Sequence, residues 1–196
     1  MCGRFVLYDE KENREISELL RELEEKRVEV KKGEVFPTNR ALVVLPGDEQ
    51  TRRPAAVTWG YPPFTGSRVI INARAETAHE KPLFAASFRR HRCLIPSTGF
   101  FEWTRDNRKT KNKYWLHLPE EPLVYMAGLV KEFHEELRFV ILTTQANDSV
   151  APIHHRMPVV LNPWELDDWL HHPDTARSIL QDWKSRPELV SEMAPA

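Results

Sequence analysis

The feature of this chain that most constrains its fold is a change of hydrophobic period near residue 33. Before it, Ile16, Leu19, Leu20 and Leu23 repeat at i, i+3, i+4 and i+7, which predicts one amphipathic helix. After it, the apolar residues come in short runs closed by proline and glycine, and residues 41–45 and 54–60 read as the two strands of a hairpin. Because strands and helices do not alternate regularly, the pattern predicts an α+β fold that is rich in antiparallel pairing.

The remaining elements follow the same reading. Strands are predicted at residues 68–71, 93–96, 100–103, 113–117, 122–130, 137–144 and 157–161, and a long hairpin loop joins the third of these to the fourth. Short helices are predicted at 83–88, from a capped start at Asn162 with Glu165 at its third position, and after Asp174. A chain of 196 residues with 41% hydrophobic residues can bury one core, so we expect a single domain over residues 1–196.

Positive charge is concentrated in the middle of the chain. Residues 35–115 hold 14 basic and 6 acidic side chains, a local net charge of +8, although the whole chain has a formal net charge of −1. The basic residues include the run 89–92 and the cluster 105–113, which together could follow a phosphate backbone. The alternative is a solvated face that pairs with the acidic ends of the chain.

Cys2 holds a position that no internal cysteine shares, because removal of Met1 would leave it at the N-terminus with amine and thiol on one residue. With reference pKa values of about 8.5 for a thiol and about 7.7–8.0 for an α-amine, both nucleophiles are partly available near neutral pH. An aldehyde could form a Schiff base with the amine, and the thiol could then close a five-membered thiazolidine ring. The competing interpretation is that Cys2 is only a small apolar residue that starts a strand.

Four polar residues stand in apolar surroundings, where burial is costly without partners: Asn72, Arg74, Glu102 and His154. Glu102 lies among aromatic residues in Phe100-Phe101-Glu102-Trp103 and is a candidate proton donor or acceptor, unless strand alternation points it outward. His154 precedes a predicted strand, so its imidazole is expected at a strand mouth. No cysteine or carboxylate stands near it at zinc-ligand spacing, so we expect no metal site.

Several ordered sequence blocks together resemble the SOS-response-associated peptidase (SRAP) family of abasic-site processing proteins. The resemblance spans residues 2 to about 161 and is carried by Met1-Cys2-Gly3-Arg4-Phe5, Pro37-Thr38, Trp59-Gly60, and the blocks at 71–77, 93–96, 101–103, 127–129 and 153–158. The opening block alone would be a weak signal, because class II glutamine amidotransferases also begin with Met-Cys-Gly. The resemblance implies a barrel-like β core with peripheral helices.

The resemblance also implies roles for individual residues. Cys2 matches the N-terminal nucleophile that forms a thiazolidine with the ring-opened sugar of an abasic site in single-stranded DNA. Asn72 matches the residue that orients this nucleophile, Glu102 the catalytic glutamate beside the amine, and His154 the histidine linked to sugar ring opening and crosslink reversal. The DNA-binding positions that we predict are Arg4, Pro37, Trp59, Tyr61, Arg74, Trp103 and Arg156.

The chain departs from the family pattern in two places. Residues 60–64 replace a loop that commonly carries a second tryptophan, and we expect Tyr61 to stack on a base instead. His155 stands where an acidic residue is frequent, which bears on how His154 is oriented.

The partner implied by the resemblance is single-stranded DNA that contains abasic sites, and the activities are lesion shielding in the SOS response to DNA damage, AP-lyase-type chemistry and autoproteolytic exposure of Cys2. We expect a monomer without metal or organic cofactor. The N-terminus has no signal-peptide pattern and no apolar run of membrane-spanning length, which predicts a cytoplasmic protein that joins the nucleoid when bound to DNA. Two alternatives stay open: a cysteine N-terminal-nucleophile hydrolase, and a non-covalent single-stranded DNA-binding module.

Overall fold

A closed β-barrel of five strands forms the centre of the computed structural model, which describes residues 2–8, 14–63, 65–104, 112–119 and 121–195. The barrel strands are β3 (Arg40–Pro46), β4 (Arg52–Trp59), β6 (Arg92–Ser97), β9 (Val124–Phe133) and β10 (Glu136–Gln145). They follow the order β10-β4-β3-β6-β9, and pairing between β9 and β10 closes the ring. The predicted hairpin is confirmed, because β3 and β4 pair antiparallel with Val43 opposite Ala55.

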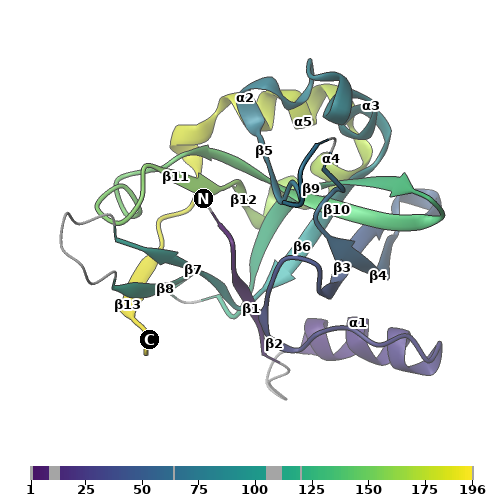
Figure 1. Cartoon of the computed structure of the whole chain (residues 1–196), viewed down its shortest axis with the longest axis horizontal. Helices are drawn as coiled ribbons and strands as arrows, with labels where there is room; N and C mark the ends of the chain where they lie inside the picture. The colour runs from purple at the N-terminus through teal and green to yellow at the C-terminus, as the bar shows by residue number, and fades with distance from the viewer. Residues whose placement is uncertain (1, 9–13, 64, 105–111, 120, 196) are drawn as a thin grey trace.

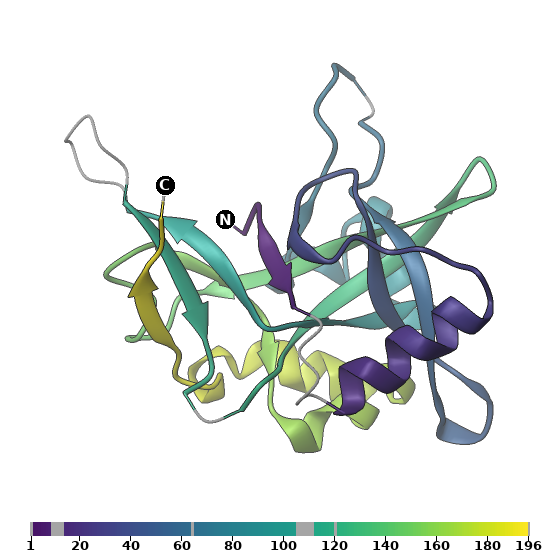
Figure 2. The same ribbon diagram turned by 90° about the horizontal axis from the view of Figure 1, so that it is seen from below.

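A second sheet lies against the barrel and contains the start and the end of the chain. Its order is β13 (Val190–Met193), β8 (Lys113–His117), β7 (Gly99–Trp103), β1 (Phe5–Leu7) and β2 (Gly33–Val35). All of its pairings are antiparallel, and they include the predicted pair formed by residues 100–103 and 113–117. Figures 1 and 2 show this sheet beside the barrel, with β13 at one edge and β1 between β7 and β2.

The helices are peripheral. The amphipathic helix α1 (Arg14–Glu25) packs on β4. Four more, α2 (Ala75–Ala78), α3 (Pro82–Arg90), α4 (Leu166–His171) and α5 (Pro173–Gln181), gather on another side of the barrel in Figure 1. Short 3-10 turns, η1 (Asp48–Gln50), η2 (Pro163–Glu165) and η3 (Trp183–Ser185), complete the set. In the described part of the chain, no helix has the length and apolar character needed to cross a membrane.

Strand alternation divides the buried side chains between two hydrophobic clusters. On β3, Leu42 and Val44 join a cluster that includes buried residues of all five helices, whereas Ala41 and Val43 join a cluster that includes Cys2 and the second sheet. Because successive side chains of a strand point to opposite faces, each barrel strand that contributes to both clusters is covered on both sides. The result is the α+β fold that the sequence pattern predicts, with the barrel-like β core that the family resemblance implies.

Two strand predictions are corrected by long-range pairing. Residues 68–71 form only an isolated bridge, Ile70 with Tyr61, and the strand is instead β5 (Asn72–Arg74), which pairs in parallel with β10. The predicted strand 157–161 is divided into β11 (Arg156–Pro158) on β10 and β12 (Val160–Leu161) on β9. In both cases a partner distant in sequence decides where regular pairing occurs, and local hydrophobic period does not report that partner.

Candidate active site around Cys2

Cys2 lies three residues before β1, at the point where the second sheet meets the barrel. The antiparallel pairing of β1 with β7 continues toward the N-terminus, where the Phe101 amide donates to the Arg4 carbonyl (2.9 Å). From the barrel side, the Asn72 amide nitrogen donates to the Cys2 carbonyl oxygen (2.9 Å). Cys2 is 0% exposed and packs in the hydrophobic cluster that contains residues of both sheets.

The surroundings of the Cys2 thiol oppose its ionisation. Burial raises the pKa of this thiol far above its ordinary value, and the nearby charge of Glu102 raises the pKa further. The sulfur donates a weak hydrogen bond to the Arg4 carbonyl (3.7 Å), which only partly offsets these effects. The expectation of a partly ionised thiol near neutral pH is therefore wrong for this enclosed state, in which the thiol is neutral.

Glu102 is inside the molecule and not on its surface. Glu102 lies on β7, which pairs antiparallel with β1 so that Phe100 stands opposite Phe5. Glu102 follows Phe100 by two residues and therefore lies alongside the residues that precede Phe5. Glu102 is 4% exposed, and its charge acts on the Cys2 thiol. The outward orientation that alternation left open is excluded, because both faces of β7 are covered at this end.

Asn72 begins β5, opposite Ile141 of β10. Its amide nitrogen holds the Cys2 carbonyl, while its side-chain oxygen is buried and has no hydrogen-bond partner in the part of the chain that the structure describes. A buried acceptor without a partner is costly in a folded protein. The oxygen therefore offers an acceptor beside Cys2.

His154 lies on the turn that leads into β11 and is 5% exposed. Its Nδ1 is 3.0 Å from the Arg156 amide and 2.9 Å from the Arg156 carbonyl oxygen, so in either neutral tautomer this nitrogen has a backbone partner. The ring also stacks on His155, with centroids 4.5 Å apart. These contacts fix the orientation of the imidazole.

Arg74 and Arg156 flank the end of β10, on the two strands that pair with it. Arg156 donates to the Thr143 carbonyl and forms a two-pronged ion pair with Glu76, with 2.9 Å between Nη2 and Oε2. Partial burial disfavours ionised Glu76, but its hydrogen bonds and the charge of Arg156 outweigh this and hold the carboxyl pKa below its ordinary value. Arg74, opposite Thr143 on β5, is exposed. Sequence reasoning missed Glu76 as the partner of Arg156, although it lies inside the block that carries the family resemblance.

Arg4 joins the second sheet to the turn at residues 36–39. Its guanidinium pairs with Glu34 (3.1 Å) and lies over the rings of Phe36 and Trp103, 4.4 and 5.1 Å from their centroids. Pro37 lies in the same turn and is half-buried, as is Trp103. The structure thus brings Arg4, Pro37 and Trp103 together at one surface.

Trp59 and Tyr61 are corrections to the predicted DNA contacts. Both are 0% exposed: Trp59 donates to the Ile71 carbonyl (3.0 Å) and stacks on Phe139, while Tyr61 donates to the Leu129 carbonyl (3.1 Å). Neither ring is accessible to a base, because Trp59 packs in the cluster that includes Cys2 and Tyr61 packs in the cluster that includes the helices.

The basic middle of the chain is also only partly a surface feature. Arg92 is buried and donates to the backbone carbonyls of α3 and α4, and Lys113 pairs with Glu34 (2.8 Å). The cluster at 105–111 lies outside the described residues. An arginine or lysine in this segment is therefore no indication by itself of a phosphate contact.

A hollow of about 680 Å³ opens beside Asn72 and Arg74, between β5 and the start of α3. Its lining combines apolar Ile70, Leu83 and Phe84 with the cationic Arg74 and Lys81. Among the described residues, no three His, Cys, Asp or Glu side chains gather closely enough to hold a metal ion. The arrangement is a buried thiol and carboxylate beside an open, partly cationic surface.

The chain is similar to known proteins over most of its length. The family model described as SOS response associated peptidase (SRAP) matches residues 1–193. Abasic site processing protein YoqW of Bacillus subtilis is 33% identical over 93% of this chain and 88% of its own length. Abasic site processing protein YedK of Escherichia coli is 28% identical over 87% of this chain and 79% of its own length.

Solved structures show the same fold. A crystal structure of a protein from Bacteroides thetaiotaomicron superposes with a TM-score of 0.78 at 23% identity, covering 99% of this chain and 92% of its own. A second, from Bordetella bronchiseptica, gives a TM-score of 0.77 at 20% identity and covers 100% of both chains.

Proposed function

Since the chain belongs to the SOS response associated peptidase (SRAP) family, we propose that it processes abasic sites in single-stranded DNA by crosslinking Cys2 to them once Met1 is removed. The observation that carries the proposal is the enclosure of Cys2, whose carbonyl is held by Asn72 and whose thiol lies within the field of the buried Glu102 carboxylate. The relatives named as abasic site processing proteins supply the substrate class.

The chemistry begins with the sugar, which must open to expose its aldehyde. His154 would accept the proton of the anomeric hydroxyl while the ring carbon–oxygen bond breaks and the ring oxygen takes a proton from water. The fixed orientation of the imidazole supports this role, because proton transfer requires a positioned base.

Two bonds to Cys2 then form in turn. Its amine adds to the aldehyde and expels water to give an imine, and its sulfur adds to the imine carbon while the thiol proton passes to nitrogen. A neutral, buried thiol needs a base for this second step, and Glu102 is the carboxylate beside it. Release of Met1 by the protein itself would be the peptidase reaction for which the family is named.

The test compares three proteins on abasic single-stranded DNA: the mature protein, a protein with a non-removable N-terminal tag, and Cys2→Ser. Only the mature protein is expected to give a heat-stable adduct on a denaturing gel, because ring closure requires amine and thiol on one residue. Cys2→Ser keeps the amine, so borohydride should trap its imine.

The other outcomes would assign the protein a different mechanism or function. A full-strength stable adduct from the tagged protein or from Cys2→Ser would overturn the mechanism. Binding without any adduct would identify a non-covalent DNA-binding module, and Cys2-dependent hydrolysis of an amide without an adduct would identify a hydrolase.

A further inference from the structure

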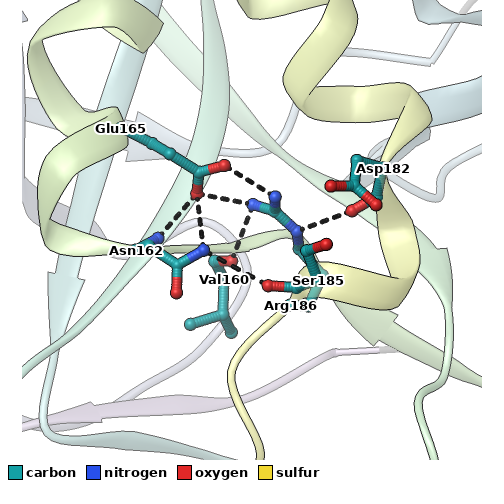
Figure 3. Close-up of polar contacts among 6 residues, drawn as sticks. All are labelled: Val160, Asn162, Glu165, Asp182, Ser185 and Arg186. Atoms are coloured by element: carbon teal, nitrogen blue, oxygen red, sulfur yellow. Dashed lines mark hydrogen bonds and ion pairs between the residues drawn. The ribbon is translucent and has the colours of Figure 1, made fainter.

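A buried ion pair anchors the C-terminal segment, which we define as residues 182–193. The Arg186 side chain is 1% exposed and forms a two-pronged pair with Glu165, at 2.7 and 2.8 Å. Its remaining hydrogen bonds go to the Val160 and Asp182 carbonyls (both 3.2 Å), so every guanidinium nitrogen has a partner (Figure 3). Asn162 donates to the same carboxylate from its backbone (2.8 Å) and its side chain (3.0 Å). This network fixes the backbone at Arg186.

The fixed backbone in turn holds Asn147. The Asn147 side-chain nitrogen donates to the carbonyls of Arg186 (3.3 Å) and Pro187 (2.9 Å), and its side-chain oxygen accepts from the Ser149 hydroxyl (2.7 Å). The Ser149 oxygen also accepts from the Leu189 amide (3.0 Å). The C-terminal segment is therefore hydrogen-bonded to the side chains of Asn147 and Ser149.

Asn147 begins the turn that ends at His154. Its carbonyl accepts from the amides of Val150 (3.1 Å) and Ala151 (2.9 Å), and the Val150 carbonyl accepts from the amides of Ile153 (2.9 Å) and His154 (3.0 Å). An unbroken series of hydrogen bonds thus runs from the buried Arg186 to the backbone of His154.

The segment also reaches the other half of the candidate site. Its last strand, β13, pairs with β8 so that Met193 lies opposite Tyr114, and Tyr114 lies opposite Glu102 of β7. One short segment therefore contacts both the turn that carries His154 and the sheet that carries Glu102.

We propose that Asn147 is a positioning residue for His154 and that the C-terminal segment, anchored by Arg186 and Glu165, acts on the reaction through it. The proposal rests on the proposed function for the role of His154. In this proposal, residues far along the chain from Cys2 control the orientation of the imidazole that acts in the reaction at Cys2.

The experiment is a double-mutant cycle on the rate of adduct formation with abasic single-stranded DNA. Asn147→Ala should slow the reaction by about tenfold to a hundredfold, since a small misplacement of a reacting group can cost a factor of that size. In a His154→Ala background the same substitution should cause no further loss, because the two residues act as one unit. Equal losses in both backgrounds, or no loss in either, would overturn the proposal.

A spectroscopic readout separates positioning from general damage. Nitrogen NMR of the labelled imidazole should show changed His154 ring shifts in Asn147→Ala, whereas Glu192→Gln should leave them unchanged. Glu192 is the matched control, because it lies in the same segment but pairs with His117 (3.3 Å) and stands opposite Trp115, both on β8. Unchanged His154 shifts in Asn147→Ala would also reject the proposal.

The two experiments distinguish failure of the proposed function from failure of the Asn147 proposal. If the wild-type protein forms no adduct, the crosslinking proposal fails, but the NMR comparison still decides whether Asn147 orients His154. If Asn147→Ala does not fold, Ser149→Ala removes one hydrogen bond of the same series and should change the His154 shifts in the same way.

Discussion

At the scale of single residues, Cys2 and Glu102 illustrate how burial changes the reactivity of a side chain. The thiol is enclosed and neutral, so its reactivity depends on a base in its own surroundings and not on the solvent. In the mechanism that we propose, the carboxylate that raises the pKa of the thiol also accepts its proton. The same electrostatic contact would then protect the nucleophile at rest and serve it in reaction.

Glu102→Gln tests this dependence. The substitution retains the shape of the side chain and removes the proton acceptor, so adduct formation should slow by about 100-fold or more while DNA binding is unchanged. Rapid-quench gels with abasic DNA measure the rate, and binding to intact single strands is the control. A rate equal to that of the wild type would exclude Glu102 as the base.

The buried thiols also predict how stability depends on pH. Burial raises the pKa of the Cys93 thiol above its ordinary value of 9.0, so the folded protein keeps a proton that the unfolded chain releases above that pH. The stabilisation is complete below about pH 9 and is lost as pH rises, by up to about 1.4 kcal/mol per pH unit for each thiol. Urea unfolding at pH 8 and pH 10 should show a smaller loss for Cys93→Ala than for the wild type. An identical loss would contradict the prediction.

At the scale of elements, β10 organises the candidate site, because β5 and β11 both pair with its end and deliver Asn72, Arg74 and Arg156. Local pattern was enough to predict the hairpin β3–β4 and helix α1. It singled out Cys2, Glu102 and His154 only as candidates, and their roles were implied by the family resemblance. Local pattern was not enough for β5 or for the burial of Trp59 and Tyr61. Those depend on parallel pairing and packing between segments about 70 residues apart, which no local period encodes.

The ion pair between Arg186 and Glu165 leads to a prediction for the C-terminal elements. Glu165→Gln leaves a buried guanidinium without its counter-charge and should lower the free energy of unfolding by about 3–5 kcal/mol. Glu22→Gln breaks the exposed pair with Lys26 (2.7 Å) and should cost at most about 0.5 kcal/mol. Denaturant titration of the two variants measures the difference, and similar values for both would show that burial does not strengthen the pair.

At the scale of the whole molecule, the number of basic residues in the sequence does not give the positive charge on the proposed DNA surface. Arg92 and Lys113 are internal, and Arg4 and Arg156 each have a carboxylate partner. Arg74 is the exposed arginine of β5, beside the hollow next to Asn72. We therefore expect it to make a direct phosphate contact.

Salt dependence provides the measurement. Initial binding to single-stranded DNA should weaken with salt by a logarithmic slope of roughly −0.7 for each phosphate contact, whereas the finished adduct should be insensitive to salt. Arg74→Ala should reduce the slope by about one contact, and Arg21→Ala on α1 should not change it. An initial encounter that does not depend on salt would remove the case for this surface.

The pairing of β1 with β7 also has a consequence for the time course of synthesis. The partner residues Gly99 and Phe100 leave the ribosome only after roughly 5–20 s of translation at about 5–20 residues per second. During that interval the first residues lack the strand that later encloses Cys2. If an aminopeptidase removes Met1, we expect it to act within this period of seconds, whereas release of Met1 by the protein itself would follow the pairing of β1 with β7.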